Sequence, residues 1–224
     1  MRYSQFLQPL AVCLSICALA RPISADPPQW QLGDVFLAVG GGSYDVFSPA
    51  GVFKHSLQQD GGGYTGDCGF SPDLSTLVTT NYTNSRLFIF EDGASHAALK
   101  TIETGEVSPG GHAGAVVFDD AGNLFVGHPD GNSLIHKYSA AGSLVETYDV
   151  EVDKRGSNWL DLAADQSTVY YTSQGRYIHR YEVATRTQLA PFAELPGEGH
   201  AQAIRLLAPG DGSGGLLVAD GVNI

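Results

Sequence analysis

A short apolar segment recurs five times along this chain at nearly even spacing, with starts 42, 47, 45 and 47 residues apart. Each copy is rich in Val, Leu, Tyr or Phe and runs into a polar or glycine-rich turn, which is typical of β-strands rather than of helices. Beyond the first 25 residues, no stretch shows convincing helical periodicity. The five copies are 35–39, 77–81, 124–128, 169–173 and 216–220.

Further strand-like segments accompany each copy and complete a four-strand unit. A second segment follows each of the first four copies, a third precedes each of the last four, and a weaker outer segment closes the unit, as at 144–148. Four strands in about 40–50 residues, repeated, describe the blade of a β-propeller. One blade cannot bury both of its faces alone, so neighbouring blades must pack around an axis. We therefore predict an all-β fold, a β-propeller of four-stranded blades; a β-sandwich is the weaker alternative because similar units are evenly spaced.

One repeat carries a resemblance to a known family. Residues 116–127 read VVFDDAGNLFVG and 132–138 read NSLIHKY, which together resemble an NHL repeat. The wider resemblance, over most of 33–224, is to six-bladed propellers of the SMP-30/gluconolactonase and streptogramin-lyase type. The chain holds about four and a half units, so this resemblance implies a propeller domain over 26–224 that is truncated from six blades.

The N-terminal segment reads as an export signal. Arg2 is followed by a short apolar run and then by small residues, the layout of a secretory signal peptide. Small residues permit cleavage after Ala20 or Ala25, and Pro27–Pro28 favours Ala25 because it suits an extended mature terminus. The apolar run is shorter than the roughly 20 residues that span a bilayer. We predict a signal peptide over 1–25, a secreted or periplasmic protein and no membrane insertion.

Charge and cysteine content narrow the possible partners. The chain has 12 Lys and Arg against 24 Asp and Glu, a formal net charge of −12. Such a chain has no basic stripe to neutralise phosphates, so nucleic acid is excluded as the expected partner. Cleavage after Ala25 removes Cys13 and Cys17 and leaves Cys68 unpaired, so the fold does not depend on disulfides.

The loops that lead into the first and third strands of the blades lie on one face of an antiparallel propeller, and ligand sites favour such loops on a rigid frame. His112 and His200 occupy equivalent places there, each after a Pro-Gly sequence, and are candidate acid/base residues. The alternative is repeated turn chemistry, with each ring bonded to a nearby carbonyl. His136 and His179 share a repeat position with Phe88, which favours packing inside the blades. The candidate ligand-binding residues are Asp67, His128, Asn158, Trp159, Glu198, Gln202 and Asp220.

The leading functional hypothesis is an exported binding scaffold that presents this loop-rich face to a small molecule or a protein. The alternative is a metal-assisted hydrolase or lyase at the mouth of the central channel, with a divalent cation such as Ca²⁺ or Zn²⁺. The resemblance to SMP-30-type enzymes implies a cation held by Glu and Asn/Asp, and Asn158 and Asp220 match that set in type, although no glutamate is placed. Streptogramin-type lyases use His and Glu, which His112, Glu198 and His200 would supply.

Overall fold

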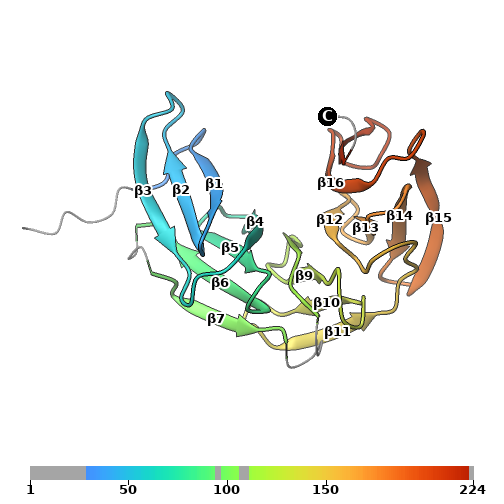
Figure 1. Ribbon diagram of the computed structural model, residues 1–224, viewed down its shortest axis with the longest axis horizontal. Helices are drawn as coiled ribbons and strands as arrows, with labels where there is room; N and C mark the ends of the chain where they lie inside the picture. The colour runs from blue at the N-terminus through green and yellow to red at the C-terminus, as the bar shows by residue number, and fades with distance from the viewer. Residues whose placement is uncertain (1–28, 94–96, 106–110, 222–224) are drawn as a thin grey trace, which may run out of the picture.

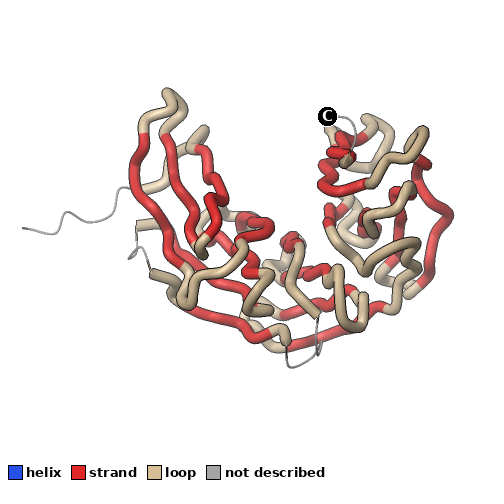
Figure 2. The backbone as a smooth tube through the Cα atoms, viewed as in Figure 1, coloured by secondary structure: helices blue, strands red, loops and turns tan. Residues whose placement is uncertain are grey.

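The computed structural model describes residues 29–93, 97–105 and 111–221, and all regular structure in these ranges is β-strand (Figures 1 and 2). The predicted signal peptide at 1–25 lies outside the described residues. In the described ranges, no helix has the length and apolar character needed to cross a membrane.

In the described residues seventeen strands form five sheets, and within each sheet every strand pairs antiparallel with the next one in the chain. The first sheet has three strands, the next three sheets have four each, and the last has two. In chain order the sheets are β1 Val35–Gly40, β2 Ser43–Phe47 and β3 Phe53–Gln58; β4 Thr65–Phe70, β5 Thr76–Asn81, β6 Arg86–Glu91 and β7 Lys100–Glu103; β8 Ala115–Phe118, β9 Leu124–Gly127, β10 Ile135–Tyr138 and β11 Leu144–Tyr148; β12 Trp159–Leu162, β13 Thr168–Thr172, β14 Tyr177–Glu182 and β15 Thr187–Glu194; β16 Ala201–Leu206 and β17 Leu216–Asp220.

The five sheets stand side by side in an open arc (Figure 1). Strands β4, β8, β12 and β16 contact one another in sequence along the inside of the arc, so they are the innermost strands of successive blades. The five recurring segments of the sequence are the second strands, β1, β5, β9, β13 and β17. The prediction of an all-β propeller with four-stranded blades is therefore confirmed.

The core lies between the sheets, because successive side chains of a strand point to opposite faces. Leu77 of β5 packs toward the first sheet, whereas its neighbour Val78 packs toward the third. In β13, Tyr171 packs with the third sheet and Tyr170 with the fifth. Second strands are therefore apolar on consecutive positions rather than alternating, since both of their faces are covered.

Hydrogen bonds between neighbouring blades hold the starts of two first strands in place. The Thr80 hydroxyl donates to the carbonyl of Gly114, 3.3 Å away in the next blade. Two blades further on, the Thr172 hydroxyl donates to the carbonyl of Gln202 at 2.7 Å. Both threonines lie within one residue of the end of a second strand, and both acceptors lie within one residue of the start of a first strand. The same contact thus holds two of the loops that lead into first strands.

Candidate ligand-binding site

A pocket of about 470 Å³ opens where the loops that lead into first and third strands converge. Gly66 and Gly114 form part of its wall at the starts of the second and third blades. Its lining includes no residue from the turns at the opposite ends of the blades, so both sets of loops share one face, as the sequence indicates. The aromatic and larger polar residues that line it are Tyr64, Tyr82, Arg155, Asn158, Trp159, Gln174 and Gln202.

Three aromatic rings supply the apolar surface of this loop-face pocket. Tyr64 is 65% exposed, and its ring stands edge-on to that of Tyr82 with centroids 6.1 Å apart. Trp159, the first residue of β12, is half-buried. It lines both this pocket and a second pocket along the innermost strands, which is called the central channel below. Flat rings of this kind can stack on a ligand ring without losing much conformational entropy.

The charge on Arg155 is satisfied inside the protein. Its guanidinium is paired with the Asp130 carboxylate and donates to the Tyr82 hydroxyl at 2.9 Å and to the Gln174 amide oxygen at 3.4 Å. Burial acts to raise the pKa of Asp130, but the hydrogen bonds from Arg155 and Tyr82 outweigh it and lower that pKa below its ordinary value. The pair is therefore ionised at neutral pH, and it adds no net charge to the pocket.

Two amide side chains carry unused hydrogen-bonding groups. Asn158 is 8% exposed, and within the described ranges its side-chain amide has no hydrogen-bond partner, although its backbone N–H is bonded to Thr172. The Gln202 side chain, half-buried at the same repeat position in the next blade, is also without a partner among the described residues. An amide offers two donors and one acceptor. The pocket thus presents donors and acceptors together beside aromatic rings.

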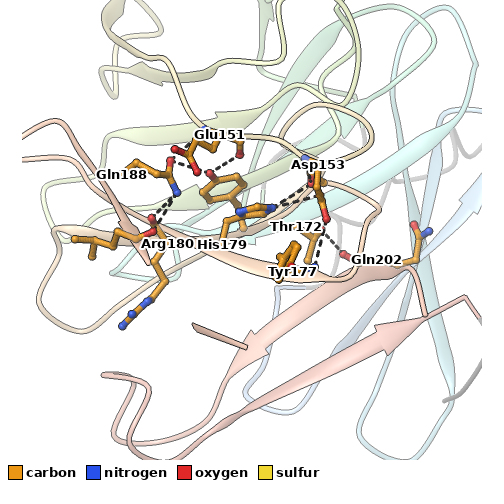
Figure 3. A network of polar contacts seen from close by, with 11 residues as sticks. Glu151, Asp153, Thr172, Tyr177, His179, Arg180, Gln188 and Gln202 are labelled. Atoms are coloured by element: carbon orange, nitrogen blue, oxygen red, sulfur yellow. Dashed lines mark hydrogen bonds and ion pairs between the residues drawn. The ribbon is translucent and has the colours of Figure 1, made fainter. Parts of the chain in front are cut away.

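A polar network behind the pocket holds the loop that carries Arg155 (Figure 3). Asp153 Oδ1 lies 3.3 Å from His179 Nε2, and the Asp153 backbone N–H donates to the Ser173 hydroxyl at 3.1 Å. The backbone N–H of Arg155 then donates to the Ser173 carbonyl at 2.8 Å. His179 is 4% exposed and stacks on Tyr171. Its predicted place in the blade interior is confirmed, with the added role of anchoring Asp153.

The structure brings together three of the predicted site residues, Asn158, Trp159 and Gln202. His112 lies just beside them: its ring stacks on Tyr82 with centroids 4.3 Å apart, and its Nδ1 is 2.6 Å from the Tyr82 carbonyl oxygen.

His200 is held differently. Its Nδ1 lies 3.2 Å from Lys154 Nζ. The two histidines are equivalent in the repeat, yet no partner is common to both rings in the part of the chain that the structure describes. One of them supports the pocket wall through Tyr82, and the other contacts a lysine on a neighbouring loop.

Asp67 lies in the central channel rather than in the loop-face pocket. The channel has a volume of about 580 Å³ and runs along the innermost strands. Asp67 accepts a hydrogen bond from the backbone N–H of Val116 at 3.1 Å. Burial raises the pKa of its carboxyl to about 7.

Three other predicted residues are absent from the lining of the loop-face pocket. His128 is completely buried, because it follows β9 directly and its side chain points into the blade. Glu198 is exposed, and Asp220 is half-buried at the end of β17 opposite Ala201. Across 29–93, 97–105 and 111–221, no three His, Cys, Asp or Glu side chains cluster closely enough to hold a metal ion.

Four of the aromatic and larger polar residues that line the pocket are not among the residues predicted from the sequence: Tyr64, Tyr82, Arg155 and Gln174. Each lies in a loop that leads into a first or third strand. Their residue types give the missing signal, because tyrosine and arginine are enriched where proteins bind other molecules.

The comparisons with known proteins concern the fold. Neither a protein-family model nor a curated protein matches the chain. Among solved structures, hydrazine synthase of Kuenenia stuttgartiensis, a propeller-containing protein, is similar with a TM-score of 0.63 and 13% identity. The chain folds as a β-propeller. The match covers 80% of this propeller and 50% of the hydrazine synthase chain, so this propeller spans about half the length of that chain. At such identity the likeness shows the fold alone.

Proposed function

We propose that this protein is an exported, NHL-like propeller of the SMP-30 type that binds a small neutral saccharide in its loop-face pocket. The observation that carries the proposal is the Asn158 side chain, which is 8% exposed and unpartnered within the described residues while it lines a pocket with aromatic walls. The Asn158 amide atoms are not among the buried unpartnered atoms of the described residues, so they are open to the pocket, where each hydrogen bond to a ligand contributes about 0.5–1.5 kcal/mol.

The chemistry of the pocket favours a neutral sugar over a charged ligand. A sugar ring has a C–H face that packs on an aromatic ring, and its hydroxyl groups both donate and accept. Trp159 and Tyr64 supply the rings, and Asn158 and Gln202 supply matching donors and acceptors. Arg155 is already neutralised by Asp130, so an anionic ligand would have to compete for it.

We expect N-acetylglucosamine, as the first probe, to quench the fluorescence of Trp159 saturably. The chain has two tryptophans, so Trp30→Phe leaves Trp159 as the single reporter. Loss of two unpartnered amides in Asn158→Ala/Gln202→Ala should weaken binding by about 10- to 100-fold, at about 1.4 kcal/mol for each factor of ten. Titration of both proteins by fluorescence and by calorimetry checks this.

Gln58→Ala is the matched control, because Gln58 is an exposed amide on β3, away from the pocket lining. It should bind the sugar as the parent protein does. Glucuronate and glucosamine, which carry opposite charges, should bind more weakly than N-acetylglucosamine. Equal binding by the parent and the double variant would contradict the proposal, as would no binding of any of the neutral sugars glucose, galactose and N-acetylglucosamine.

The proposed export signal predicts the position of the mature N-terminus. We expect the protein recovered from outside the producing cell to begin at Asp26, because Ala25 ends the small-x-small sequence. Intact-mass measurement and N-terminal sequencing check the position. A chain that keeps Met1, or that stays in the cytosolic fraction, would contradict the export proposal while leaving sugar binding untouched.

A further inference from the structure

His128 is a buried polar residue whose own hydrogen bonding is incomplete. It is 0% exposed, and within the described ranges neither Nδ1 nor Nε2 makes a hydrogen bond of good geometry; one poorer hydrogen bond, to the backbone of His112, acts to raise its pKa. His136 is 1% exposed, and the centroid of its ring lies 4.6 Å from that of His128. Its Nδ1 is unpartnered as well. Buried polar groups are nearly always bonded, so two adjacent imidazoles with unused nitrogens call for an explanation.

His128 is built into the wall of the loop-face pocket. Its backbone N–H donates to the Ser157 hydroxyl at 2.9 Å, and the next carbonyl, of Pro129, accepts from the backbone N–H of Gly156 at 2.8 Å. The following residue, Asp130, holds Arg155. Residues 128–130 therefore lie directly against 155–158, of which Arg155 and Asn158 line the pocket; these two segments together are called the wall, and the His128 ring is buried in it beside His136.

Within the described residues, no carboxylate is among the groups that act on the His128 ring, so none stabilises its protonated form. The titratable groups that act on His128 are His136 on β10 and His112 on the loop before β8, and both are histidines. Burial is the main cause that lowers the pKa of His128 to about 3, and the neighbouring His136 ring is the second. Burial likewise lowers the pKa of His136. Both rings are therefore neutral at pH 7 as long as the wall is closed.

We propose that His128 is an acid sensor for the loop-face pocket: a proton on its ring opens the wall formed by 128–130 and 155–158, and the pocket releases its ligand. Ligand release rests on the proposed function, whereas the opening itself does not. In the open wall the ring reaches water, and its pKa returns to the ordinary value of about 6.5. The closed wall binds fewer protons than the open one, so it loses stability as the pH falls below about 6.5, approaching tenfold in the closed-to-open ratio for each pH unit.

The first test needs no ligand. In the full chain carrying Trp30→Phe, the emission of Trp159 is followed from about pH 7.5 to about pH 4.5, the range of histidine titration. We expect a reversible transition below about pH 6.5. His128→Gln keeps a polar side chain and His128→Phe keeps a ring, but neither can take a proton, so both should abolish the transition. The two together guard against one variant failing to fold, which circular dichroism at pH 7.5 detects.

Two control variants separate His128 from other groups near Trp159. Asp67→Asn removes the channel carboxyl, and His112→Gln removes the imidazole stacked on Tyr82. Both should keep the transition. The proposal is overturned if the parent shows no transition, if both His128 variants keep it, or if either control abolishes it.

The second test measures ligand release. The affinity for N-acetylglucosamine should fall at least about tenfold from pH 7.5 to pH 5.0 in the parent and change less than about twofold in His128→Gln. A His128-dependent transition without sugar binding at any pH would refute the proposed ligand and leave the acid opening intact. Sugar binding that weakens equally in the parent and in His128→Gln would refute the sensor and leave the proposed function intact.

Discussion

Phe125→Ala is expected to lower the free energy of unfolding by about 3–5 kcal/mol, the usual cost of removing a large buried ring. Phe125 lies on β9 and is 0% exposed between the third and fourth sheets. Its ring stacks on Tyr148 with centroids 6.0 Å apart, and Lys137 Nζ lies 4.7 Å from its centroid. Because both faces of this blade are covered, neighbouring side chains cannot collapse fully into the vacated space. Denaturant titration followed by circular dichroism measures the loss.

Phe53→Ala is the matched control for this core position. Phe53 lies on β3 and is 54% exposed, with one edge-on contact to Phe47. Its removal should cost less than about 1 kcal/mol, since the ring gives up little buried area. Similar losses at Phe125 and Phe53 would mean that the third and fourth blades are not packed against each other as described.

The strands and their order follow from the sequence because each blade obeys simple local rules. The segment 169–173 is apolar at consecutive positions, as a strand covered on both faces must be, and glycine or polar turns bound it. The structure places β13 at Thr168–Thr172, within one residue of that segment. The repeat spacing then fixes which strands lie innermost, and so which loops share a face.

The candidate site follows from the sequence only in part, because side-chain direction depends on details that a repeat does not encode. Asn158 and Gln202, two of the predicted residues, line the loop-face pocket. Asp67 occupies the same repeat position as Trp159 and both line the channel, but only the larger Trp159 side chain also lines the loop-face pocket. The Asp130–Arg155 pair joins loops 25 residues apart, and nothing in either loop by itself specifies the other partner.

Gly156→Ala is expected to damage both stability and ligand binding. A Cβ at Gly156 would lie 2.1 Å from the carbonyl oxygen of His128 and 2.7 Å from Cα of Ser133. Both are backbone atoms, so neither can swing aside as a side chain could. The two wall segments, 128–130 and 155–158, must therefore move apart. This should lower the free energy of unfolding by at least about 1–3 kcal/mol. Denaturant titration measures this cost.

The effect on binding should exceed what the stability loss alone implies, because the displaced segment carries both Asn158 and the partner of Asp130. We expect the affinity for N-acetylglucosamine to fall at least about tenfold at pH 7.5, about 1.4 kcal/mol. Gly221→Ala is the matched control, since a Cβ there would meet His200 Cβ at an ordinary 3.6 Å. If Gly156→Ala binds the sugar as tightly as Gly221→Ala does, the wall formed by 128–130 and 155–158 does not shape the site. Sugar recognition would then have to come from other lining residues such as Tyr64 and Trp159.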